Sequence, residues 1–147
     1  MKKFNKIQGT EVDLILNKYC EAIPEKKWVP KFVYHIVLHN SNTIIGECEA
    51  RIGTSDNLFF NGHIGYAINP EYRGHGYAGK AVKLLLSVCK DNGLEKIYIT
   101  NTPENKNSRR VCEKLDAKHL GVYELPQDNP MRIEDGKTHV NVFEIKL

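Results

Sequence analysis

The stretch INPEYRGHGYAGKAVKLLL, residues 68–86, decides the fold prediction because three local signals meet in it. A strand-like segment runs into Pro70, which cannot continue a strand ladder and favours a turn. Gly74, Gly76 and Gly79 then fall within six residues, and a helical pattern begins straight afterwards. The sequence therefore predicts a strand, a glycine loop and a helix in immediate succession.

The glycine loop is a candidate site for a phosphate group. Apolar residues at spacings of three and four predict a helix with one buried face, formed by Ala78, Ala81, Val82, Leu85 and Cys89. The first turn of a helix leaves backbone N–H groups without partners, and the helix dipole adds partial positive charge there. Glycine lets such a backbone approach a ligand closely and adopt positive φ, and Arg73 would add charge.

A short glycine pattern is also typical of a solvated strand-to-helix turn, and for a bare G-x-G this alternative is the commoner outcome. The loop lacks the G-x-G-x-x-G fingerprint with its later acidic residue, which argues against dinucleotide binding. It also lacks the G-x-x-x-x-G-K-[ST] pattern of nucleotide hydrolases.

The rest of the chain predicts one mixed α/β domain, residues 1–147. Strands are expected at residues 12–17 (where a helix is the alternative), 31–39, 43–53, 63–68, 96–100, 120–125 and 140–147. A second helix is expected at 105–115, a polar turn at 55–57 and irregular segments at 20–30 and 126–139. This order implies a mixed, mostly antiparallel sheet flanked by helices.

Composition narrows the function classes. Of 147 residues, 41% are hydrophobic and 27% are charged, which is typical of a globular chain. A net charge of +3 from scattered residues does not favour a nucleic-acid partner. No apolar run approaches the ~20 residues that span a bilayer, so we expect a cytoplasmic protein without a membrane partner. The cysteines predict reduced, mostly buried thiols rather than disulfides or a metal site; they are Cys20, Cys48, Cys89 and Cys112.

Residues 64–81, IGYAINPEYRGHGYAGKA, resemble the acetyl-CoA-binding signature of the GNAT superfamily of N-acetyltransferases. The core of that signature, Arg/Gln-x-x-Gly-x-Gly/Ala, is matched by Arg73, Gly76 and Ala78. Residues 101–117, NTPENKNSRRVCEKLDA, resemble the family's second signature, at the expected distance. In motif style the chain is most similar to the ribosomal-protein alanine acetyltransferase branch. The resemblance implies a GNAT fold, with acetyl-CoA between splayed central strands.

The resemblance also implies an activity. The chain would be an N-acetyltransferase that moves an acetyl group from acetyl-CoA, its co-substrate, to a primary amine of a small molecule or peptide by direct attack. A homodimer is expected because dimers are common among such relatives. The alternative is an acyl-CoA-binding module without turnover, because two residues that many relatives use are replaced here.

The resemblance assigns cofactor contacts to both signatures. The end of the strand at 66–68 would line the pantetheine arm, the glycine loop would hold the pyrophosphate, and Asn105 would bind the pantetheine. A helix N-cap role for Asn105 is compatible with this assignment. The expected contacts are Tyr66, Ala67, Ile68, Arg73, Gly74, His75, Gly76, Tyr77, Ala78, Gly79, Asn105 and Ser108.

The resemblance leaves the general acid open. Many relatives place a tyrosine seven residues after the asparagine, and this chain has Cys112 there, on an apolar helix face that also suits simple packing. The ribosomal-protein branch has serine at the position of Ser108. The candidates, in order, are Ser108, Cys112 and Tyr123.

The general base is open as well, because Thr100 stands where many relatives carry glutamate. Glu47 and Glu49 share one face of a predicted strand, and His63 titrates in a suitable range. Each has an ordinary alternative, since strand glutamates are usually solvated and a lone strand histidine is usually structural. A water chain is a further alternative. The short connection at 20–30 replaces helices of relatives and predicts an acceptor cleft that is open, or completed by another subunit or by residues 126–139.

Overall fold

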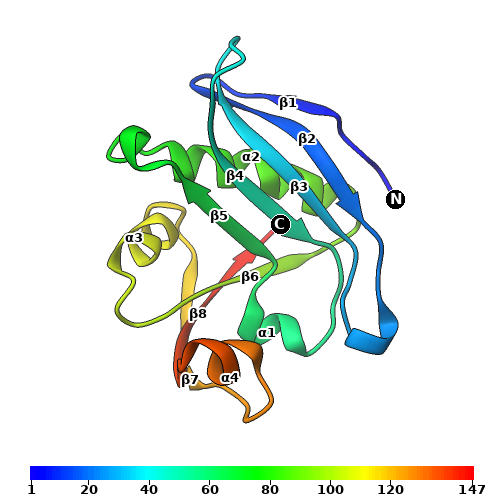
Figure 1. Cartoon of the computed structure of the whole chain (residues 1–147), viewed down its shortest axis with the longest axis vertical. Helices are drawn as coiled ribbons and strands as arrows, with labels where there is room; N and C mark the ends of the chain where they lie inside the picture. Colours follow the sequence, from blue (N-terminus) through cyan, green and yellow to red (C-terminus); the bar gives the residue numbers. More distant parts are fainter.

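Two antiparallel sheets form the framework of the protein, whose computed structural model describes residues 1–147 (Figure 1). The first has the order β1-β2-β3-β4-β5 and consists of β1 (Lys6–Gln8), β2 (Val12–Cys20), β3 (Lys31–Leu38), β4 (Ile44–Arg51) and β5 (Ile64–Ile68). The second has the order β6-β8-β7 and consists of β6 (Lys96–Asn101), β8 (His139–Lys146) and β7 (Lys118–Glu124). Strands β5 and β6 are the facing edges of the two sheets.

Four helices flank these sheets: α1 (Asn57–Asn61), α2 (Tyr77–Asp91), α3 (Lys106–Lys114) and α4 (Pro130–Asp135). Short 3-10 turns precede β3 and α2, at Pro24–Lys26 and Pro70–Tyr72. In Figure 1, α2 lies behind the five-stranded sheet, and the opposite face of β2–β4 carries no helix. The predicted α/β class, with antiparallel sheets flanked by helices, is confirmed. No helix of the structure combines the length and the apolar character needed to cross a bilayer.

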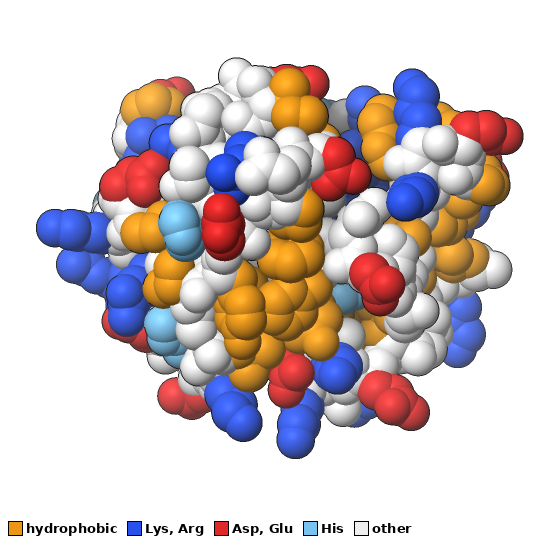
Figure 2. All heavy atoms as spheres, turned by 90° about the horizontal axis from the view of Figure 1, so that it is seen from below, with side chains coloured by type: hydrophobic (Ala, Val, Ile, Leu, Met, Phe, Trp, Pro, Cys, Tyr) orange, Lys and Arg blue, Asp and Glu red, His pale blue; other side chains and the backbone are white.

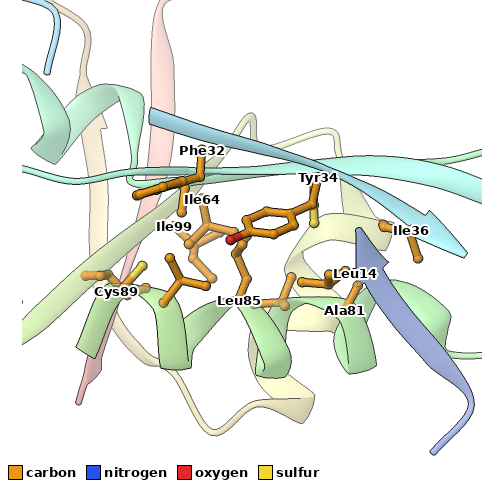
Figure 3. Close-up of a cluster of buried hydrophobic side chains, with 14 of the residues drawn as sticks. Leu14, Phe32, Tyr34, Ile36, Ile64, Ala81, Leu85, Cys89 and Ile99 are labelled. Atoms are coloured by element: carbon orange, nitrogen blue, oxygen red, sulfur yellow. The ribbon is translucent and has the colours of Figure 1, made fainter. Parts of the chain in front are cut away.

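The main core lies between the five-stranded sheet and α2. Figure 3 shows Leu14 and Tyr34 from the strands facing Leu85 of the helix, and all three side chains are 0% exposed. The helix residues at spacings of three and four are buried as predicted, with Ala78 at the edge of the core. Burying this stripe fixes the direction in which α2 leaves the glycine loop.

The segment at residues 12–17 is a strand, and the alternative of a helix is wrong. It forms β2, which pairs with β1 on one side and β3 on the other. Backbone hydrogen bonds to two neighbours outweigh the weak helical spacing of Val12, Leu16 and Tyr19. The short strand β1 was not predicted.

Two segments expected to lack regular structure contain helices. Residues 126–139 include α4, where the Asn129 side chain accepts from Met131 N–H at 2.9 Å and Gly136 ends the helix with a φ of 67°. Asparagine before Pro130 and glycine after the last turn are ordinary helix boundaries, so the sequence carried this signal. The turn at 55–57 leads into α1, which ends at Gly62 with a φ of 76°.

Candidate active site

Strands β5 and β6 meet at one end and separate toward the other. The N–H of His63 donates to the carbonyl of Tyr98 at 2.7 Å, and beyond this point β5 pairs only with β4 and β6 only with β8. In Figure 1 the two strands diverge from this contact, and α3 lies at the open side. The opening therefore lies between Tyr66–Ile68 on β5, the end of β6 and the first turns of α3.

Backbone groups of β5 face this opening. The N–H of Asn69 points toward β4 and donates to the carbonyl of Ile45 at 2.8 Å. The carbonyl of Ile68 points away from β4 and accepts from Arg73 Nε at 2.8 Å. Because backbone groups along a strand alternate between its two edges, the N–H of Tyr66 also points away from β4. The Arg73 contact also holds the glycine loop against the end of β5.

The glycine loop presents a row of backbone donors. None of the N–H groups of residues 74–79 donates to another group of the chain, and the first hydrogen bond of α2 runs from Lys80 N–H to the Gly76 carbonyl. Gly74 and Gly76 have φ values of 89° and 76°, which favour glycine strongly. A Cβ placed on Gly74, Gly76 or Gly79 would meet no atom within 4 Å, so the space in front of the loop is open. This arrangement suits a phosphate group.

The remaining predicted loop contacts lie around the same donors. His75 is exposed and its ring lies 5.2 Å from the ring of Tyr77, the first residue of α2. Ala78 and Gly79 follow in the first turn. The loop residues are therefore gathered in one place, at the end of β5 and the start of a 15-residue helix.

Ser108 lies across the opening from β5. Its Oγ is 2.8 Å from the hydroxyl of Tyr66, which joins α3 to β5. Burial raises the pKa of Tyr66 to about 12, although the hydrogen bond with Ser108 lowers it in part. The sequence placed only the Tyr66 backbone at the site; its hydroxyl was missed because no local pattern indicates where a strand side chain ends.

Asn105 is the N-cap of α3, since its side chain accepts from Ser108 N–H at 3.2 Å. It is exposed, which leaves its amide nitrogen free for a ligand. Asp116 follows α3 in the left-handed region, with a φ of 56°.

Two candidate acids are poorly placed to donate a proton at the opening. Cys112 is 0% exposed in the main core, and burial raises the pKa of its thiol to about 12. Tyr123 pairs with Val140 on the opposite face of the three-stranded sheet, and its ring lies 4.9 Å from that of Phe59. Neither position supports proton donation at the opening.

The candidate bases differ in their partners. Glu49 is held by Lys31 at 3.2 Å and by Arg51 at 2.9 Å. Glu47 is exposed and lies opposite Ala67 in the register of β4 and β5. Since its neighbour Cys48 faces the core, Glu47 points to the sheet face without α2.

Both ring nitrogens of His63 have partners, so the structure does not support its predicted role as a base. Its Nδ1 accepts from Tyr98 N–H at 2.9 Å, its Nε2 donates to the Gly53 carbonyl at 2.9 Å, and the side chain is 3% exposed. No ring nitrogen remains for an amine. Burial lowers the pKa of His63 below its ordinary value, and the charge of Arg51 adds to this, against the effect of the two hydrogen bonds.

We expect the free energy of unfolding to decrease at acidic pH because of His63. The folded protein keeps the ring neutral, whereas the unfolded chain binds a proton at the ordinary pKa of about 6.5. Unfolding therefore takes up a proton below that pH. The contribution of His63 to the free energy of unfolding is complete above about pH 6.5 and is lost as the pH falls toward the lowered pKa. Urea unfolding of the wild type at pH 7.5 and 5.5, compared with His63→Gln, measures this. The variant should be less stable at pH 7.5 and lose less stability on acidification; equal losses would contradict the assignment.

Helices α1 and α4 border the side of the molecule shown in Figure 2. Hydrophobic side chains gather at the centre of this view, beside a hollow. The Asn129 amide donates to the Asn61 side chain at 2.9 Å, so residues 126–139 pack on α1.

One cavity of about 480 Å³ is lined by Thr54, Ser55, Asp56, Phe59, Phe60, His63, Lys96 and Tyr98. Another, of about 420 Å³, is lined by Pro103, Glu104, Val122 and residues 135–139. Neither includes the glycine loop.

Comparisons with known proteins agree with this architecture. Residues 9–118 match the model of the acetyltransferase (GNAT) domain. The uncharacterized N-acetyltransferase YnaD of Bacillus subtilis (strain 168) is 35% identical over 69 residues, which cover 45% of this chain and 41% of YnaD. The chain therefore spans less than half the length of this relative.

Two solved structures are similar in fold. The ribosomal-protein-S5-alanine acetyltransferase of Vibrio fischeri has a TM-score of 0.61 and 23% identity, over 79% of this chain and 61% of that protein. The microcin C7 self-immunity acetyltransferase MccE, solved with acetyl-CoA and AMP, has a TM-score of 0.61 and 18% identity, over 80% of this chain and 61% of that protein. Because the family model matches most of the chain, the protein belongs to the GNAT acetyltransferase family.

Proposed function

We propose that the protein is an acetyl-CoA-dependent N-acetyltransferase that acts on a primary amine of a small molecule or peptide. The observation that carries this proposal is the row of unpartnered N–H groups at residues 74–79, placed beside the opening between β5 and β6. Membership of the GNAT family and the acetyl-CoA found in MccE support it. Acetyl-CoA supplies the acetyl group as a thioester.

The chain's residues hold the donor at two places. The N–H groups of residues 74–79 bind the pyrophosphate, and the dipole of α2 favours its negative charge. The exposed amide of Asn105 bonds to the pantetheine arm, and the backbone of Tyr66–Ile68 lines it. The N–H of Tyr66 polarises the thioester carbonyl and stabilises the charge that develops on its oxygen.

Ser108 donates a proton to the leaving sulfur, and Glu47 accepts the proton that the amine loses. As the nitrogen of a neutral amine bonds to the carbonyl carbon and the carbon–sulfur bond breaks, the sulfur takes the proton of Ser108 Oγ. Ser108 regains a proton from the Tyr66 hydroxyl, its partner at 2.8 Å, and Tyr66 regains one from solvent. The proton that the amine loses passes through water to Glu47, which is exposed and has no ion-pair partner, in contrast to Glu49.

Thermal unfolding with and without acetyl-CoA and a turnover screen test the proposal together. Acetyl-CoA at about 100 times its dissociation constant should stabilise the protein by about 2.7 kcal/mol. Release of coenzyme A is then measured with polyamines, aminoglycosides, amino acids and short peptides. Tight binding without release for any amine would favour the alternative, a binding module without turnover. Absence of binding would contradict both.

A further inference from the structure

A line of side-chain hydrogen bonds runs behind Ser108 to the surface. His119 Nε2 lies 2.9 Å from Asn141 Oδ1, Asn141 Nδ2 donates to Asn101 Oδ1 at 3.2 Å, and Asn101 Nδ2 reaches Ser108 Oγ at 3.4 Å. The line crosses β7, β8, β6 and α3. Asn141 and Asn101 are 1% and 6% exposed, whereas His119 is at the surface.

The direction of the line follows from the chemistry of its members. An amide group donates through nitrogen and accepts through oxygen, so fixing one end of an amide chain fixes every link. His119 donates from Nε2–H, a form available to the neutral and to the charged ring. Each asparagine then accepts through its oxygen from the preceding residue of the line and donates through its nitrogen to the next one. Ser108 Oγ is therefore an acceptor from Asn101, and it also lies within reach of the Tyr66 hydroxyl at 2.8 Å.

We propose that His119, Asn141 and Asn101 are positioning residues that orient the Ser108 hydroxyl for the proposed acetyl transfer. With both lone pairs of Oγ occupied by Asn101 and Tyr66, the Ser108 hydrogen is left to point at the departing sulfur. The step is the one already described: the sulfur gains the Ser108 proton as the carbon–sulfur bond breaks, and Tyr66 replaces that proton. This inference rests on the proposed function.

Burial makes this arrangement costly unless it is complete. A buried amide without its hydrogen bonds is unfavourable, and apolar side chains would fill a core at lower cost. Here Asn101 and Asn141 face the same core as Ile99 and Phe143, which are 1% exposed. Every buried polar side-chain atom of the protein has a partner, so the line is complete from His119 to Ser108.

The outer end of the line allows a test that introduces no buried charge. Glutamine at position 119 can donate to Asn141 and keeps the direction, whereas glutamate of the same size only accepts. An acceptor at 119 turns the Asn141 amide, which in turn turns Asn101, so that Ser108 must donate its proton to Asn101 Oδ1. His119→Glu and His119→Gln are therefore a matched pair at an exposed site.

We expect His119→Glu to lower kcat about tenfold relative to His119→Gln. This is a part of the roughly 10²–10⁴-fold rate enhancement that a positioned acid or base contributes. The dissociation constant of acetyl-CoA and the melting temperature should be equal in the two variants. A second readout needs no ligand: the ¹⁵N–¹H signals of the Asn101 and Asn141 side-chain amides should shift in His119→Glu and stay near wild type in His119→Gln.

The outcomes separate the inference from the function on which it rests. Absence of wild-type turnover overturns the proposed function. Wild-type turnover with equal kcat and equal amide signals in the two variants overturns the positioning role alone. If His119→Glu loses acetyl-CoA affinity or folded structure in parallel with kcat, the line is structural and the inference is wrong. Asn107→Asp, an exposed change on α3, should leave kcat unchanged.

Discussion

Gly76→Val should raise the dissociation constant of acetyl-CoA at least about a hundredfold while the protein remains folded. Gly76 precedes α2 with a φ of 76°, and the space at its Cβ position contains no atom within 4 Å. A valine side chain there extends into open space within the donor row itself, not into the core. Loss of even two charge-assisted hydrogen bonds, at roughly 1.5–3 kcal/mol each, accounts for this change in affinity. Isothermal titration with acetyl-CoA measures it.

The matched control is Gly93→Val, at the other end of the same helix. Gly93 has a φ of 90° and equally open surroundings, so both variants bear a similar backbone strain of roughly 1–2 kcal/mol. Gly93→Val should bind acetyl-CoA as the wild type does. Unchanged affinity in Gly76→Val would contradict the phosphate site, and equal losses in both variants would attribute the effect to a weakened α2.

Ser108→Ala should lower kcat about a hundredfold at saturating acetyl-CoA without changing the dissociation constant of acetyl-CoA. The change removes the proton donor but keeps the N-cap bond, because that bond uses the backbone N–H of Ser108. Single-turnover release of coenzyme A measures the chemical step. Tyr66→Phe should also lower kcat, and the double variant should lose little more than Ser108→Ala, since the two hydroxyls act as a unit.

Two controls accompany this prediction. Ser87→Ala makes the same chemical change on α2, where the hydroxyl bonds only to the Leu84 carbonyl, and should leave kcat unchanged. Cys112→Ala should reduce stability by about 1 kcal/mol through lost packing, with kcat within a few-fold of the wild type. A Ser108→Ala enzyme as fast as Ser87→Ala would remove Ser108 from the mechanism and leave the Tyr66 hydroxyl as the acid to test.

The parts of the site that were predictable are those built from neighbouring residues. The glycine loop, the helix after it and the Asn105 cap depend on backbone geometry within a few positions, so spacing and residue type were sufficient. The helix α4 has equally local signals at Asn129 and Gly136, although an irregular segment was predicted there. His63 was predicted as a base because its residue type suits one, whereas its hydrogen bonds depend on Tyr98 and Gly53, which lie outside its own segment.

The sequence by itself determined the α/β order, the glycine loop before α2 and membership of a family whose signatures are local. Only the tertiary structure decided which side chains meet at the opening and behind it: Tyr66 with Ser108, 42 residues apart, and Asn101 with Asn141, 40 residues apart. The physical reason is that a backbone conformation depends on the residues beside it, whereas a hydrogen bond between side chains of different elements depends on how those elements pack. The packing of α2, α3 and the two sheets is set by the whole core, and no short segment contains it.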